Sequence, residues 1–141
     1  MARVKIEMPP RFPFVTEIEL RVTDMNYGGH MGNDALVSLL HEARVQMLRW
    51  QGLSEKSIDG LHVLQADLAV MYRAEGFAGD RLRFEVAVAD LSRAGCDFFY
   101  RVSRVSDGTL VAEAKAGMVF VDPVSRKVAA LPESMKRLAA L

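Results

Sequence analysis

The chain has 141 residues, with 18 basic and 18 acidic side chains and a formal net charge of zero. This length fits one hydrophobic core, so we expect a single domain over residues 1–141. The lack of a basic excess argues against a general nucleic-acid binder. No apolar run approaches the ~20 residues that cross a bilayer, so we expect no membrane partner.

The cysteine content and the N-terminus bear on location. Cys96 is the single cysteine, so the chain has no internal disulfide and no cysteine cluster for zinc. Residues 1–7 are interrupted by charges and lack the apolar core of a signal peptide. We therefore expect a cytoplasmic protein.

Residues 14–22 alternate between apolar and polar side chains, which predicts a half-buried strand. The prolines at positions 9, 10 and 13 make the preceding residues an extended lead-in. Asp24 lies two residues beyond Val22, so a continuing strand would direct its carboxylate toward the apolar face. This placement puts Asp24 at the edge of the core.

A glycine pair follows and predicts a break before a long helix. Gly28 and Gly29 permit backbone angles that other residues avoid. Asn33 or Asp34 is then expected as the helix cap or first-turn acid. Apolar residues recur at helical spacing from there to Gln51, and they nearly encircle the helix. We therefore expect a helix that is buried on most sides.

Four strand-like runs fill most of the remaining chain: residues 61–75, 81–92, 97–106 and 110–121. Asp107-Gly108 predicts a hairpin between the last two runs. A short helix is expected from Pro132 to Leu141, with the proline in its first turn. The order predicts an α+β fold in which an antiparallel sheet of about five strands, four of them in a meander, covers one long central helix. Its edge strands favour pairing with a second copy.

The stretch that joins the first strand to the helix resembles a known family. It reads Asp24-Met25-Asn26, then His30 and Asn33, followed in the helix by His41-Glu42-Ala43-Arg44. This ordered set is similar to the hotdog-fold thioesterases, and most of all to the 4-hydroxybenzoyl-CoA thioesterase-like group. The segment from Asn26 to His30 is two residues longer than in that pattern, so the match is firmer at Asp24 and Asn26 than at His30.

The resemblance implies a hotdog fold and hydrolysis of acyl thioesters of coenzyme A or acyl carrier protein. It also implies that the reaction uses no cofactor or metal ion. The family's sites form between two copies, which implies a homodimer or tetramer. Asp24, Asn26 and His30 are the implied catalytic residues.

Thioester chemistry gives each of these residues a role. Thiolate is a good leaving group, because a thiol has a reference pKa near 8.5. Asp24 either attacks the carbonyl carbon or deprotonates a water, and both routes are compatible with the sequence. Asn26 would orient water or substrate, and His30 would position the acid or the thioester. Amides at Gly32, Asn33 and Asp34 are suited to bind the carbonyl oxygen of the substrate.

Other interpretations of the same residues stay open. Asp24 and Asn26 would satisfy loop backbone groups if the turn were merely structural, and His30 would then be a plain loop residue. On the same fold, a hydratase or dehydratase of acyl thioesters would need a well-placed His–Asp or His–Glu pair. A non-catalytic module would bind an acyl thioester without turnover.

Overall fold

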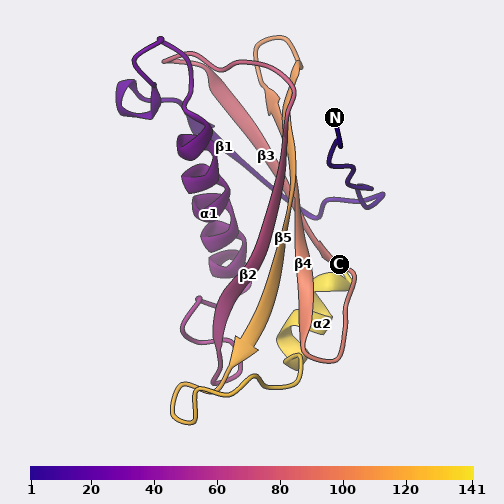
Figure 1. The fold of residues 1–141 in the computed structure, drawn as a ribbon. Helices are drawn as coiled ribbons and strands as arrows, with labels where there is room; N and C mark the ends of the chain where they lie inside the picture. Colours follow the sequence, from indigo (N-terminus) through magenta and orange to yellow (C-terminus); the bar gives the residue numbers. More distant parts are fainter.

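The computed structural model describes all residues from Met1 to Leu141. One antiparallel sheet contains the strands β1 (Phe14–Glu19), β2 (His62–Tyr72), β3 (Arg81–Ala89), β4 (Gly95–Arg104) and β5 (Leu110–Val121). The helices are α1 (Asn33–Trp50) and α2 (Glu133–Ala139), and a 3₁₀ turn, η1 (Val22–Asp24), lies between β1 and α1. The sheet curves alongside α1, which confirms the predicted α+β hotdog architecture (Figure 1).

The core lies between α1 and the sheet, and alternation in β3 and β5 builds most of it. The inward side chains of β3 are Leu82, Phe84, Val86 and Val88, as predicted. β5 contributes Ala112, Ala114 and Ala116, all fully buried. Small side chains at the centre of the sheet leave room for the large ones on α1 and β3. Burying each large apolar side chain contributes about 1.5–3 kcal/mol of stability.

The strand order is β1-β3-β4-β5-β2, which corrects the prediction of a four-strand meander. Only β3, β4 and β5 follow one another in space. β2 crosses to the far edge and pairs antiparallel with β5, with a bulge between Gln65 and Asp67. This bulge shifts the register, so Val63 is buried while Leu64, predicted to face inward, is 51% exposed.

One face of α1 is buried and the other is open, so the expectation that it is buried on most sides is wrong for this chain. Its buried residues are Leu36, Leu39, Leu40, Ala43, Arg44, Met47 and Leu48. His41 and Glu42 lie on the open side. A five-strand sheet wraps only part of a helix circumference, which leaves the remaining stripe uncovered.

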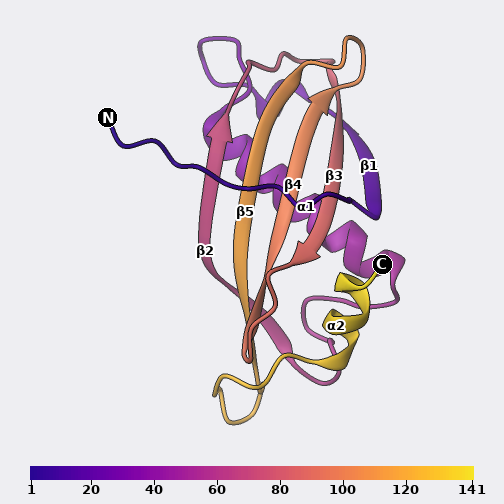
Figure 2. The ribbon, with the colours of Figure 1, turned by 90° about the vertical axis from the view of Figure 1, so that its right-hand side faces the viewer.

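The chain ends lie away from α1. The N-terminal segment crosses the opposite face of the sheet (Figure 2). Arg101 lies over the ring of Phe12 there, 4.6 Å from its centroid. α2 adds Met135 and Leu138 to the apolar core, and Asp59 accepts hydrogen bonds from the amide and hydroxyl of Ser134 at its start. Neither helix has the length and hydrophobicity required to cross a membrane.

Candidate active site

The first predicted strand ends early because Asp24 caps a turn. β1 stops at Glu19 rather than Val22, and η1 follows. The carboxylate of Asp24 accepts a hydrogen bond from the backbone N–H of Arg21 at 2.8 Å, which closes the 3₁₀ turn. Val22 is consequently 80% exposed, whereas Asp24 is only 6% exposed. The buried position predicted for the carboxylate is thus reached by a turn and not by a continuing strand.

Arg21 determines the charge of Asp24. Its Nε donates to Oδ2 at 3.2 Å and its Nη2 donates to Oδ1 at 3.1 Å. These side-chain hydrogen bonds hold the pKa of Asp24 below its ordinary value, against the opposing effect of burial. Asp24 is therefore an ionised carboxylate at neutral pH. The side chain of Arg21 is 70% exposed, so the guanidinium reaches the carboxylate from the solvent side.

Asp24 is fixed to the start of α1 through the backbone. The N–H of Gly32 donates to the carbonyl oxygen of Asp24 at 3.0 Å. Gly32, with extended backbone angles, is the cap residue in place of Asn33 or Asp34, whereas Asp34 lies in the first turn of the helix as predicted. The amides of Asn33, Asp34 and Ala35 have no acceptor within the chain.

Asn26 organises the loop between η1 and α1. Its Oδ1 accepts hydrogen bonds from the amides of Gly28 and His30, at 2.9 and 3.3 Å. The backbone N–H of Asn26 donates to the backbone carbonyl oxygen of His30 at 2.7 Å. These contacts match the structural interpretation of this side chain, in which it satisfies loop backbone groups.

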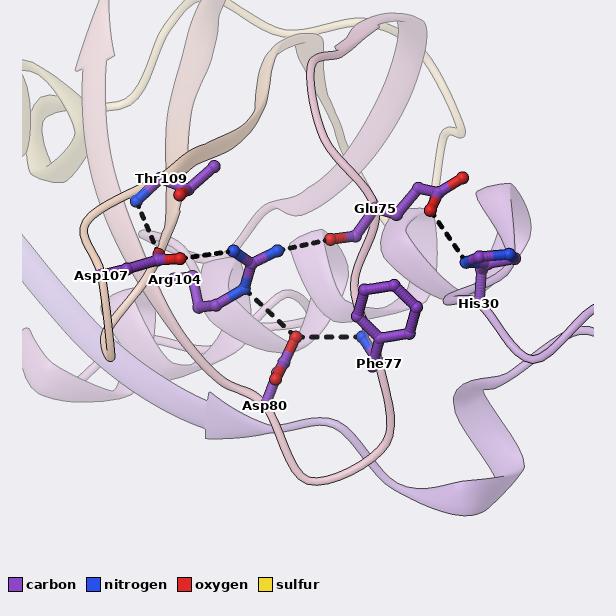
Figure 3. Close-up of polar contacts among 7 residues, drawn as sticks. All are labelled: His30, Glu75, Phe77, Asp80, Arg104, Asp107 and Thr109. Carbon is purple, nitrogen blue, oxygen red and sulfur yellow. Dashed lines mark hydrogen bonds and ion pairs between the residues drawn. The ribbon is translucent and has the colours of Figure 1, made fainter.

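His30 lies beside the segment that joins β2 to β3. Its Nδ1 is 3.0 Å from Oε2 of Glu75, and its ring centroid is 5.2 Å from that of Phe77 (Figure 3). The carboxylate lies off the ideal N–H direction, so the contact is an electrostatic pairing and not a hydrogen bond of good geometry. Nδ1 is shielded from solvent although the side chain as a whole is 40% exposed.

Two hollows flank these residues. A pocket of about 250 Å³ at the start of α1 is lined by Met31, Asn33, Tyr72, Arg73, Ala74, Glu75 and Gly76. The hydroxyl of Tyr72 donates to the carbonyl oxygen of Asn33 at 2.9 Å and so joins β2 to the helix start. A groove of about 510 Å³ between β1 and α1 is lined by Glu17, Ile18, Glu19, Arg21, Ser38, Leu39, Glu42 and Gln46.

The predicted site residues are neighbours in the fold but not all in contact. Asp24, Asn26 and His30 all lie in the segment between β1 and α1, and Gly32 joins Asp24 to the helix start. No hydrogen bond or ion pair connects the Asp24 carboxylate with the His30 ring; the first is paired with Arg21 and the second with Glu75. No group of three or more His, Cys, Asp or Glu side chains is arranged to hold a metal ion.

Sequence reasoning missed the two partners, Arg21 and Glu75. Arg21 stands three residues before Asp24, a spacing that brings side chains together across one helical turn, so it carried a signal. Glu75 carried none, because its approach to His30 depends on the path of the connection from β2 to β3.

Comparison with known proteins shows what this chain is similar to. The family model of the Thioesterase-like superfamily matches residues 20–138. The acyl-CoA thioester hydrolase YbgC of Escherichia coli is 27% identical over 114 residues, which is 79% of this chain and 84% of that protein.

Solved structures show the same fold. A 1,4-dihydroxy-2-naphthoyl-CoA thioesterase from Synechocystis superposes with a TM-score of 0.82 at 22% identity, over 90% of this chain and 95% of that one. A Staphylococcus aureus protein solved in complex with CoA superposes with a TM-score of 0.81 at 18% identity, over 96% and 86% of the two chains. Since the family match spans the site and the strands β2 to β5, the chain belongs to the thioesterase-like superfamily.

Proposed function

We propose that the protein hydrolyses acyl thioesters, with acyl-CoA as the substrate class, and that Asp24 is its catalytic carboxylate. The observation that carries this proposal is an ionised, buried carboxylate fixed through Gly32 to a helix start with unpaired amides. Membership of the thioesterase-like superfamily and the likeness to YbgC, an acyl-CoA thioester hydrolase, support the same chemistry.

The reaction follows from these groups. In one route Asp24 attacks the carbonyl carbon, the C–S bond breaks to release thiolate, and water hydrolyses the mixed anhydride. In the other route Asp24 takes a proton from water as the resulting hydroxide adds to the carbonyl carbon, and the thiolate then leaves. Either route requires the exposed Arg21 side chain to release one carboxylate oxygen. His30, which pairs with Glu75 and not with Asp24, would act on the attacking water.

The carbonyl oxygen of the substrate needs donors as its negative charge grows. The free amides at Asn33 and Asp34, with the Gly32 turn before them, are suited to this task, and the helix dipole adds to the effect. Losing one such donor costs roughly 3 kcal/mol in the barrier. The pocket of about 250 Å³ beside Asn33 would receive part of the thioester.

Coenzyme A is the preferred carrier in this proposal, with acyl carrier protein as the alternative. The S. aureus neighbour binds CoA, and YbgC is an acyl-CoA hydrolase. Arg73 lines the pocket at the helix start and offers a cation for a phosphate group. The predicted cytoplasmic location and single-domain organisation stay predictions.

We also propose that the active form is a homodimer or a dimer of dimers. β2 is an edge strand of 11 residues, and Leu64 and Tyr72 on it are exposed. An uncovered edge with exposed apolar side chains favours pairing with a second copy.

A hydratase or dehydratase is the second candidate, because the structure contains a His–Glu pair. Glu75 lines the pocket by the helix start, and its carboxylate lies 3.0 Å from Nδ1 of His30. Such a pair would move a proton on the acyl chain instead of cleaving the thioester. The two reactions differ in whether the thiol is released.

The experiment is a panel of saturated and enoyl-CoA substrates, with free thiol and enoyl absorbance followed in parallel. We expect thiol release that is first order in protein. Loss of enoyl absorbance without thiol would indicate a hydratase. Saturable binding without either signal would indicate a binding module and overturn the proposed hydrolysis.

A further inference from the structure

The connection between β2 and β3, residues 73–80, brings two side chains to His30 from a distant part of the sequence. Glu75 supplies a carboxylate 3.0 Å from Nδ1, and Phe77 supplies a ring 5.2 Å from the imidazole centroid. Both contacts depend on the path of this connection, because nothing else holds Glu75 in place through its side chain. The positions of both side chains therefore depend on the contacts that hold residues 73–80.

Arg104, at the end of β4, fixes this connection at two points. Its Nη2 donates to the carbonyl oxygen of Glu75 at 2.7 Å, and its Nε donates to Oδ2 of Asp80 at 3.2 Å (Figure 3). The same Asp80 oxygen accepts the amide of Phe77 at 3.0 Å. One guanidinium therefore holds the backbone of both residues that touch the His30 ring.

The guanidinium is itself oriented by the hairpin between β4 and β5. Its Nη1 donates to Oδ2 of Asp107 at 2.8 Å, and Oδ1 of Asp107 accepts the amide of Thr109 at 3.0 Å. The Arg104 side chain is only 16% exposed, which limits its alternative positions. Arg104 thus makes hydrogen bonds in three directions from a half-enclosed site, an arrangement typical of a structural clamp.

A glycine locks the two loops together. The carbonyl oxygen of Gly76 accepts the amide of Met31, the residue after His30, at 2.7 Å. A Cβ on Gly76 would lie 2.7 Å from Cδ1 of Leu20, so only glycine permits this approach without a shift of its neighbour. The backbones that carry His30 and Glu75 are therefore held in fixed relation.

We propose that Glu75 is a positioning residue for His30 and that Arg104 keeps it there. This inference rests on the proposed thioester hydrolysis. Because Nδ1 is shielded from water and faces a carboxylate, the neutral ring carries its proton on Nδ1. The lone pair then resides on Nε2, which is the nitrogen left to accept a proton or a hydrogen bond from the attacking water.

A double-mutant cycle tests whether Glu75 acts through His30. Glu75→Gln is expected to lower kcat by about tenfold or more, part of the ~10²–10⁴-fold that a positioned acid–base group contributes, with KM changed less than about twofold. In a His30→Ala background the same substitution is expected to have no further effect. Glu133→Gln, on α2 and paired with Lys136, is the matched control and should retain full activity.

Additive effects in the cycle, or full activity in His30→Ala, would overturn the proposal. Arg104→Gln should reproduce the loss seen in Glu75→Gln and should not add to it. Arg81→Gln, which removes an exposed pair with Glu17, is its control. Circular dichroism and the thermal midpoint identify any variant that fails to fold. If Arg104→Gln does not fold, the cycle of Glu75→Gln with His30→Ala decides the test by itself.

The tautomer of His30 gives a readout that does not depend on turnover. Long-range ¹H–¹⁵N spectra of the neutral ring, assigned with His30→Gln, should show protonated Nδ1 in the wild type. Glu75→Ala should shift the ring toward the Nε2-protonated form, and an unchanged tautomer would contradict the proposal. If the wild type releases no thiol, the proposed function fails, and this spectrum alone decides whether Glu75 positions His30.

Discussion

At the scale of single residues, the site is organised by two pairings that involve different loops. Asp24 takes its charge from Arg21 within one 3₁₀ turn, whereas His30 takes its partner from residues 73–80. The acid is therefore set by local sequence, and the imidazole by the tertiary fold. This difference predicts that substitutions at the two partners affect different properties of the enzyme.

Replacing Arg21 should change the pH dependence of activity. The hydrogen bonds from Arg21 lower the pKa of Asp24, and burial opposes them, so Arg21→Met should raise that pKa. The acidic limb of the kcat/KM profile should move to higher pH, as measured by thiol release from about pH 3 to about pH 8, a range that begins below the ordinary aspartate pKa of ~3.9. Arg81→Met should leave the limb in place, and an unshifted limb in Arg21→Met would contradict the assignment.

The same pairing predicts how stability depends on pH. A carboxyl group whose pKa is lowered by folding stabilises the folded chain above its unfolded pKa, and that contribution is lost as the pH falls through the folded value. Arg21→Met should therefore be less stable than the wild type at neutral pH. Its free energy of unfolding should also fall less as the pH drops through the folded pKa of Asp24. Urea unfolding at several pH values measures both effects.

At the scale of elements, α1 is tied to its surroundings by the buried Arg44. Its Nε donates to Glu55 at 3.1 Å, and its Nη1 donates to the hydroxyl of Tyr100 at 3.2 Å. Burial raises the pKa of Tyr100 to about 12, so the phenol stays protonated. A second oxygen of Glu55 pairs with His41 at 2.6 Å. The segment after α1 is thereby anchored to the helix and to β4.

Arg44→Ala should destabilise the fold by about 2 kcal/mol, less than the ~3–5 kcal/mol for a fully buried pair, because Glu55 keeps some access to water. Denaturant unfolding gives the free energy directly. Arg44→Met combined with Glu55→Gln should recover part of the loss, since no buried charge is then left without its partner. A double variant that is no more stable than Arg44→Ala would argue against a coupled pair.

Elements whose partners lie nearby in the sequence were predictable, and those with distant partners were not. The alternation in β3 and β5 identified the buried face of each strand, and the Asp107-Gly108 turn identified the hairpin between β4 and β5. Each of these signals is local. The position of β2 beside β5 was not predictable, since its apolar residues suit either neighbour equally well. From the sequence alone, Arg44 is expected to be a polar residue on a helix surface. Only the approach of Glu55 and Tyr100 explains its burial.

The candidate site likewise contains residues that the sequence predicts and residues that it does not. The order of Asp24, Asn26 and His30 along the chain was sufficient to find the loop, and the apolar alternation before it placed Asp24 near the core. Glu75 and Arg104 lie 45 and 74 residues beyond His30 in the numbering (75 − 30 and 104 − 30), on segments that meet the ring only after the sheet has formed. No local pattern marks such residues.

At the scale of the whole molecule, β2 leaves one edge of the sheet unpaired. We expect the wild type to have a solution mass of at least twice 15.7 kDa, measured by light scattering after size exclusion. Adding lysines to the exposed positions of this edge, Leu64→Lys with Ala66→Lys, should shift the mass toward 15.7 kDa, because charges oppose strand pairing.

The matched control adds lysines at exposed apolar positions in the two turns beside β4. Leu91 and Val105 are 45% and 44% exposed, so Leu91→Lys with Val105→Lys makes the same change of charge away from β2. The control should retain the wild-type mass. A monomeric wild type, or a β2 variant with unchanged mass, would exclude pairing through this edge.

The most direct measurement of the central claim is the rate of thiol release from a saturating acyl-CoA by wild type and by Asp24→Asn. The substitution keeps the size of the side chain and removes the ionised oxygen, so we expect kcat to fall by at least ~100-fold, as expected for loss of a catalytic acid–base group. Circular dichroism should show that the fold is retained. A variant that releases thiol at the wild-type rate would contradict the assignment of Asp24 as the catalytic carboxylate.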